Sequence, residues 1–117
     1  MKVKDSSVGT LFHPMLTALL FKFEAEYNDW GSELTITSGS EPETKHSVNS
    51  LHYATPCQAA DIRIWEVANV PSPEEQLSTL RVAADEFCAA HGIPTNWIDL
   101  ILESHHIHCE YQPKRRR

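Results

Sequence analysis

The chain has 117 residues, of which 41% are apolar and 22% are charged. This length and composition predict one domain over residues 1–117 with a modest core, and they exclude a largely disordered chain. The formal net charge of −6 argues against a nucleic-acid partner. No apolar stretch follows the first lysines, so we expect no signal peptide and synthesis in the cytoplasm. The longest apolar-rich run, residues 10–23, is interrupted by His13 and Pro14, which argues against membrane insertion.

The first predicted elements are a helix and a strand. Apolar residues recur every three or four positions over residues 14–27, which predicts an amphipathic helix. The alternating stretch ELTIT predicts a strand over residues 33–37. The polar stretch SGSEPETKHSVNS that follows is rich in turn-forming residues and predicts a loop.

A second strand is predicted over residues 59–65, where the sequence reads AADIRIW. Side chains alternate between the two sides of a strand, so Asp61 and Arg63 would share one face. Ile62 and Ile64 would share the other face. The strand is therefore expected to have one polar side and one side that faces a core.

The second helix, over residues 73–91, carries clear signals at both ends. Ser72 is a predicted N-cap, Pro73 stands at the first helical position, and Glu75 completes a capping box. Gly92 can take the left-handed conformation that ends many helices. These signals predict the boundaries of the helix as well as its existence.

Two further strands are predicted over residues 96–104 and 105–111, joined by a tight turn near 104–105. The predicted fold is α+β, with a small, mostly antiparallel sheet and two helices packed on it. The cysteines are widely spaced and odd in number, which predicts buried thiols rather than a disulfide framework. They are Cys57, Cys88 and Cys109. Residues 113–117 form a predicted basic tail.

Two histidines in the last predicted strand are spaced so that both side chains can act at one centre. His106 and His108 would point to one side, and Ile107 and Cys109 to the other, where a core could lie. Two imidazoles on one strand face can converge on a small centre, such as a metal ion. A His-x-His pair by itself is equally compatible with a solvated strand face.

A second polar cluster favours the metal interpretation. The stretch KHSVNSLHYATPCQAADIRI carries His46, His52 and Asp61. A carboxylate at the start of an otherwise apolar strand needs a partner, because burying it alone is costly. Two histidines and one carboxylate that leave a fourth position open are typical of a catalytic Zn²⁺ site.

These residues match a known family. HSVNSLHY followed by AADI, and then ESHHIHC, resembles the zinc D-Ala-D-Ala carboxypeptidases and L-Ala-D-Glu endopeptidases of peptidoglycan, which share a fold with the hedgehog signalling domain. The resemblance spans residues 35–111. The matching positions are His46, Ser50, His52, Asp61, Glu103, His106 and His108. The implied fold is the small antiparallel sheet of that superfamily, with helices packed on it and zinc in an open groove.

The resemblance also implies roles for individual residues. His52, Asp61 and His108 would bind one Zn²⁺ ion. Glu103 would act as the general base, and His106 would hydrogen-bond the developing oxyanion. These expectations define a peptidase centre of five side chains.

Other polar residues receive lesser roles. His46 would line the cleft and bind substrate, and Ser50 would fix the loop that presents His52. Arg63 shares the face of Asp61, where it could meet a substrate carboxylate or form a salt bridge with a neighbour. The remaining histidines are expected to cap helices or to lie at the surface: His13, His91 and His105.

The expected function is hydrolysis of a peptide bond in the peptidoglycan stem peptide by a monomeric zinc peptidase. A phage-type endolysin that is made in the cytoplasm and released to the cell wall fits this expectation. Many peptidases of the family carry an Arg in the loop after the first strand, and TSGSEPETK has none. That absence slightly favours the L-Ala-D-Glu endopeptidase over the D-Ala-D-Ala carboxypeptidase. The alternative is a hedgehog-like binding module that holds zinc without catalysis.

Overall fold

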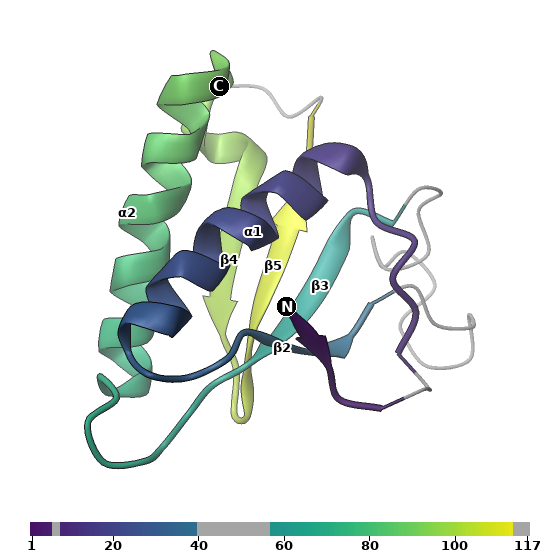
Figure 1. Cartoon of the computed structure of the whole chain (residues 1–117). Coiled ribbons are helices and arrows are strands. Elements are labelled where there is room, and N and C mark those ends of the chain that lie inside the picture. Colours follow the sequence, from purple (N-terminus) through teal and green to yellow (C-terminus); the bar gives the residue numbers. More distant parts are fainter. Residues whose placement is uncertain (6–7, 40–56, 114–117) are drawn as a thin grey trace.

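The computed structural model of the chain describes residues 1–5, 8–39 and 57–113. A five-stranded mixed sheet packs against two α-helices, which confirms the predicted α+β class (Figure 1). The elements in chain order are β1 (Lys2–Val3), α1 (Pro14–Asp29), β2 (Thr35–Ser38), β3 (Ala59–Arg63), α2 (Pro73–His91), the short 3-10 helix η3 (Thr95–Trp97), β4 (Ile98–Leu102) and β5 (His106–Tyr111).

The strands lie side by side in the order β1-β2-β3-β5-β4. β1 runs parallel to β2, and the other neighbouring pairs are antiparallel. The sequence predicted the four antiparallel strands but not β1. Two residues are too few to show alternation, and β1 pairs with residues 35–36, far along the chain. The mostly antiparallel sheet is therefore confirmed, with one parallel edge added.

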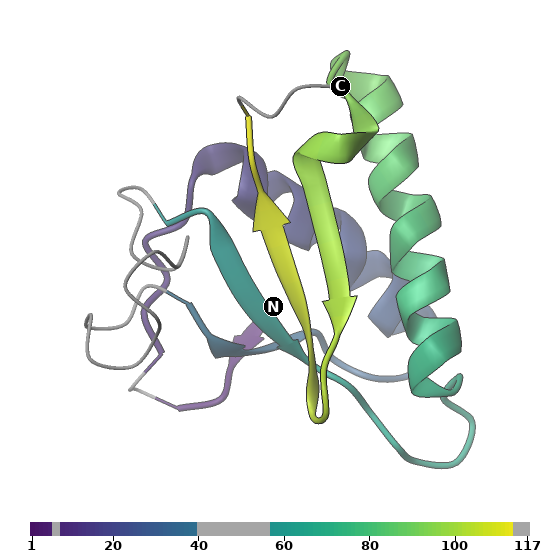
Figure 2. The same cartoon turned by 180° about the vertical axis from the view of Figure 1, so that it is seen from behind.

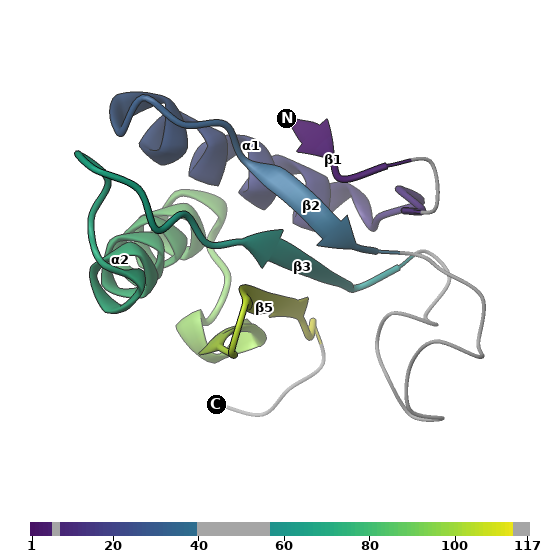
Figure 3. The ribbon, with the colours of Figure 1, turned by 90° about the horizontal axis from the view of Figure 1, so that it is seen from below.

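Both helices cover the same face of the sheet (Figures 1 and 3), and none of the described elements covers the opposite face (Figure 2). Strand register sets which side chains lie on each side. Ile62 pairs with Ile107, and both are fully buried beneath the helices. The uncovered side is here called the open face. Its side chains on the three paired strands β3, β5 and β4 include Asp61, Arg63, His106, His108, Glu110, Asp99 and Ile101.

Local capping fixes where both helices begin and where α2 ends. The Nδ1 atom of His13 accepts a hydrogen bond from the Met15 amide, which makes His13 the N-cap of α1. Ser72 caps α2 by accepting from the Glu75 amide at 3.2 Å. Gly92 ends α2 with a φ of 66°, the left-handed conformation that costs glycine little. The predicted capping residues of α2 are thus confirmed.

A buried glutamine fastens the connection between β3 and α2. The Gln76 side chain is fully buried and accepts a hydrogen bond from the Trp65 amide at 3.2 Å. Its Nε2 donates to the carbonyl oxygens of Trp65 and Pro71, both at 2.7 Å. Because the Trp65 backbone bonds to this side chain, β3 ends at Arg63, two residues before the predicted boundary.

The outer edge of the sheet is strand β4. The Glu103 amide donates to the His106 carbonyl at 2.8 Å, which closes the β4–β5 hairpin. Hydrogen-bonded pairs alternate along an antiparallel ladder, so the backbone groups of Leu100 and Leu102 point outward. The outward carbonyl of Ile98 accepts a hydrogen bond from Arg81 at 2.7 Å. The Ile98 amide donates to the Thr95 carbonyl oxygen on the same side.

All three cysteines are free and buried, as predicted. In the described part of the chain, no helix combines the length and apolar character needed to cross a membrane.

Candidate metal centre on the open face

Strand pairing brings the predicted site residues of β3 and β5 together. Asp61 pairs directly with His108, and Arg63 pairs directly with His106. Directly opposed residues of an antiparallel pair point to the same side. His106 and His108 therefore share the open face with Asp61, as the alternation in the sequence predicted.

Asp61 is the centre of the cluster and is only 8% exposed. Its Oδ1 atom accepts a hydrogen bond from Nδ1 of His108 at 2.7 Å. Nε2 of His106 lies 3.6 Å from the same oxygen. A bulge in β2 sets Ser38 opposite Asp61 after Ile36 has paired with Ile62. Such bulges often occur where a strand borders a functional site.

His108 lies between two carboxylates. In addition to the bond to Asp61, its Nε2 donates to Oε1 of Glu110 at 2.8 Å. The hydrogen bond to Asp61 raises the pKa of His108, burial opposes this effect, and the bond to Glu110 adds to the rise. A carboxylate at each ring nitrogen favours the doubly protonated form of His108, in which both nitrogens donate.

Glu103 joins the cluster from the β4–β5 hairpin. Nε2 of His106 donates to Oε1 of Glu103 at 2.7 Å. One ligand atom from each of Asp61, Glu103 and His106 lies within 4.8 Å of the other two. Carboxylate oxygen and imidazole nitrogen are both common ligands of divalent metals. This cluster could therefore hold a metal ion.

The structure places some of the predicted site residues and not others. Asp61, Glu103, His106 and His108 lie together on the open face. His46, Ser50 and His52 fall outside the described residues. The distances also show that the predicted base and the predicted oxyanion donor can both reach a metal held by Asp61.

The structure also places the residues that were predicted to have lesser roles. The Arg63 guanidinium lies over the Trp65 ring, with Cζ 5.4 Å from the ring centroid. His105 is exposed, and His13 caps α1, as predicted. Nδ1 of His91 lies 2.9 Å from the Phe87 carbonyl oxygen in the last turn of α2, which also fits its predicted place.

Glu110 was not predicted as part of the site. It follows His108 by two positions in the same strand, so the alternation that placed His106 and His108 could have found it. The Oε2 atom of Glu110 in turn accepts a hydrogen bond from Gln112. The three side chains of β5 thus extend the cluster along the open face.

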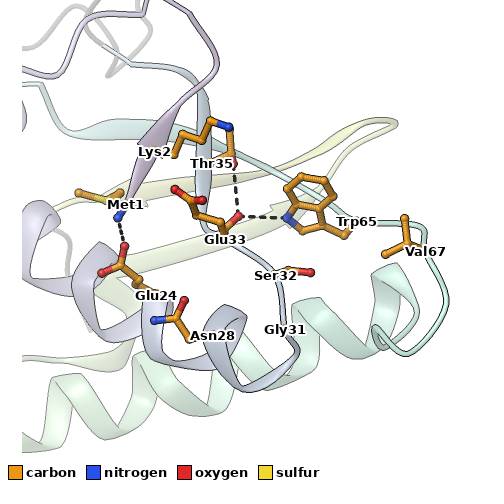
Figure 4. Close-up of a pocket in the computed structure, with 10 residues that line it drawn as sticks. All are labelled: Met1, Lys2, Glu24, Asn28, Gly31, Ser32, Glu33, Thr35, Trp65 and Val67. Atoms are coloured by element: carbon orange, nitrogen blue, oxygen red, sulfur yellow. Dashed lines mark hydrogen bonds and ion pairs between the residues drawn. The ribbon is translucent and has the colours of Figure 1, made fainter.

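A separate hollow lies in the described part of the molecule (Figure 4). It has a volume of about 720 Å³ and is lined by residues of β1, α1 and the Trp65 segment. Glu24 on its wall pairs with the Met1 amine. None of the four clustered residues lines it.

Comparison with known proteins found no matching family model, no matching curated protein and no matching solved structure. The fold and the geometry of the cluster define an α+β domain with a candidate metal centre on an open sheet face.

Proposed function

We propose that this chain is a zinc-dependent peptidase that hydrolyses a peptide bond in the peptidoglycan stem peptide. The observation that supports it best is the convergence of two histidines and Glu103 around Asp61, a carboxylate that is 8% exposed. A buried carboxylate is costly unless it is paired with a cation or a metal. The motif resemblance adds the type of metal and the class of substrate.

The donor set fits a divalent metal. Asp61 supplies the carboxylate, and His108 is the histidine closest to it, at 2.7 Å. We propose these two residues as ligands, together with His52, which the resemblance implies. Zn²⁺ commonly takes three such protein ligands in catalytic sites and, when bound, lowers the pKa of a water molecule and polarises a carbonyl group.

Glu103 and His106 would move and hold protons beside the metal. Glu103 stands at the exposed hairpin end of the cluster, where its carboxylate can accept a proton from the attacking water. It would then deliver this proton to the leaving amine. The hydrogen bond from His106 orients Glu103, and the same imidazole could donate to the developing oxyanion.

The Glu103→Gln variant tests the proposal. We expect it to bind zinc as the parent protein does, and to lose about 10²- to 10⁴-fold in the rate of stem-peptide hydrolysis. Turnover is measured as release of peptide fragments from purified peptidoglycan, and zinc affinity by competition with a chelating dye. Equal fragment release by the variant would remove Glu103 from the mechanism.

The bond that is cut can be identified in the same assay. Mass spectrometry of the released fragments separates loss of a terminal D-Ala from cleavage between L-Ala and D-Glu. A protein that binds zinc but releases no fragment from any peptidoglycan would instead support the hedgehog-like binding module.

A further inference from the structure

Strand β4 is an outer edge of the sheet, and its only neighbour is β5 (Figures 1 and 2). Hydrogen-bonded pairs alternate along this antiparallel ladder, so Ile101 bonds to β5, whereas Leu100 and Leu102 direct their amide and carbonyl groups outward. Within the described part of the chain, these outward groups of Leu100 and Leu102 have no hydrogen-bond partner. They are therefore available to pair with a further strand.

The stretch of edge that can pair is short because its beginning is closed. Arg81 donates to the Ile98 carbonyl at 2.7 Å, and the Ile98 amide donates to the Thr95 carbonyl. The other end of the edge is the β4–β5 hairpin, which begins at Glu103. A strand that covers residues 99–103 would thus pair with all of the accessible edge.

The side chains that border this edge on the open face follow an acid–apolar–acid pattern. Asp99, Ile101 and Glu103 point to the same side, because side chains alternate along a strand. Ile101 is 51% exposed and the Glu103 side chain is 48% exposed. An added strand would place its own alternate side chains directly against these three residues.

The charges along the edge favour a basic partner. Asp99 lies directly opposite Glu110 of β5, and like charges in this position destabilise a sheet. A positive side chain next to Asp99 would relieve this repulsion. The whole chain carries a formal charge of −6, which also attracts a cationic segment.

We propose that the β4 edge binds an extended segment of a partner protein by antiparallel strand addition, and that this segment carries Lys or Arg at alternate positions on both sides of an apolar residue. In strand addition the main-chain hydrogen bonds give affinity and the alternate side chains give specificity. The basic residues would lie opposite Glu103 and Asp99, and the apolar residue opposite Ile101. This inference goes beyond the peptidase proposal and does not depend on bound zinc.

A capped peptide of sequence TKTVTKT tests the hydrogen bonds. Its valine would lie opposite Ile101, and the two threonines that flank the valine would lie opposite Leu102 and Leu100. In a titration of the 15N-labelled protein, we expect the largest amide shifts at Leu100 and Leu102. Methylating the amide nitrogen of either flanking threonine should weaken binding about tenfold, because a ladder hydrogen bond is lost. The same change at the valine, whose amide would point away, should have little effect.

The register is tested by exchanging charges. Asp99→Lys should weaken binding of TKTVTKT about fivefold and should prefer TKTVTET, in which the lysine opposite position 99 is replaced by glutamate. The parent protein should show the opposite preference. Far-UV circular dichroism checks that the variant is folded. Equal binding of both peptides by the parent, or no change of preference in Asp99→Lys, would overturn the proposal.

The other outer strand provides an internal control. Lys2 and Lys4 of the β1 edge donate their amides to β2, so the Val3 amide points outward there. This edge is basic and should not bind the peptide. Shifts that are largest at Val3, or equal effects of methylation at the threonines and at the valine, would contradict strand addition at β4. A dimer of the chain alone in sedimentation velocity would assign the edge to a second copy and overturn the proposal.

Discussion

Asp61 shows how a single residue can organise a site. Its carboxylate meets His108 at 2.7 Å and His106 at 3.6 Å, so either histidine could share a metal with it. To bind a metal, His108 must give up one of its two carboxylate contacts. To bind a metal through Nε2, His106 would have to give up its hydrogen bond to Glu103, because a metal-bound ring nitrogen carries no proton. Replacing one histidine should therefore affect zinc affinity and turnover differently from replacing the other.

Replacing each histidine by alanine should separate a ligand from a catalytic neighbour. We expect His108→Ala to lower zinc affinity by more than about 100-fold, the upper end of effects seen for residues that only support a ligand. His106→Ala should keep zinc affinity within about tenfold and lose turnover. Competitive chelator titration gives the affinities. The reverse order would show that Asp61, Glu103 and His106 are the ligand set.

Among the elements, the segment between β3 and α2 shows how a polar side chain can define where a strand ends. Gln76 makes three hydrogen bonds to the backbone of Trp65 and Pro71 and has no exposed surface. These bonds satisfy polar groups that would otherwise be buried without partners. They also support the ring on which Arg63 lies.

Gln76→Leu should be strongly destabilising although its size is nearly conserved. The change leaves several backbone groups without their partner, and each such loss costs about 1–3 kcal/mol when buried. We expect a total loss of roughly 2–4 kcal/mol in the free energy of unfolding, measured by urea denaturation. Ser78→Gln, on the exposed side of the same helix, is the control and should change stability by less than about 0.5 kcal/mol.

The elements also show how much could be predicted from sequence. The caps of α2 and the alternation in β5 are local signals, and the structure confirms both. The pairing of Asp61 with His108 follows from register, which the alternation constrains but does not determine. β1 and the hydrogen bonds of Gln76 depend on contacts between distant segments, and no local sequence pattern predicts them.

In the whole molecule, the layer of helices and the sheet bury Tyr27 between them. Its hydroxyl donates to the Arg63 carbonyl at 3.3 Å. Burial raises the pKa of Tyr27, with a smaller contribution from Cys109. A raised pKa in the folded state means that the unfolded chain loses this proton first. The contribution to stability is therefore complete below pH 10, the unfolded value, and is lost as the pH rises further.

Comparison with Tyr27→Phe isolates this effect. At pH 7 the variant should be less stable by about 1 kcal/mol, because the Arg63 carbonyl loses a donor. Above pH 10 the parent should lose about 1.4 kcal/mol per pH unit more than the variant, so that the two stabilities cross. Urea denaturation between pH 7 and pH 11 measures the difference. A constant gap across this range would contradict the assignment.

The outward backbone of β4 has a consequence for the behaviour of the protein in concentrated solution. Exposed strand edges invite growth into fibres by pairing with further copies. If two such edges met antiparallel with Leu100 facing Leu102, the half-exposed Ile101 side chains would touch each other. The same register would place Asp99 of one copy against Glu103 of the other, and like charges directly opposite oppose pairing. We therefore expect these two acids to oppose edge-to-edge pairing of copies at neutral pH.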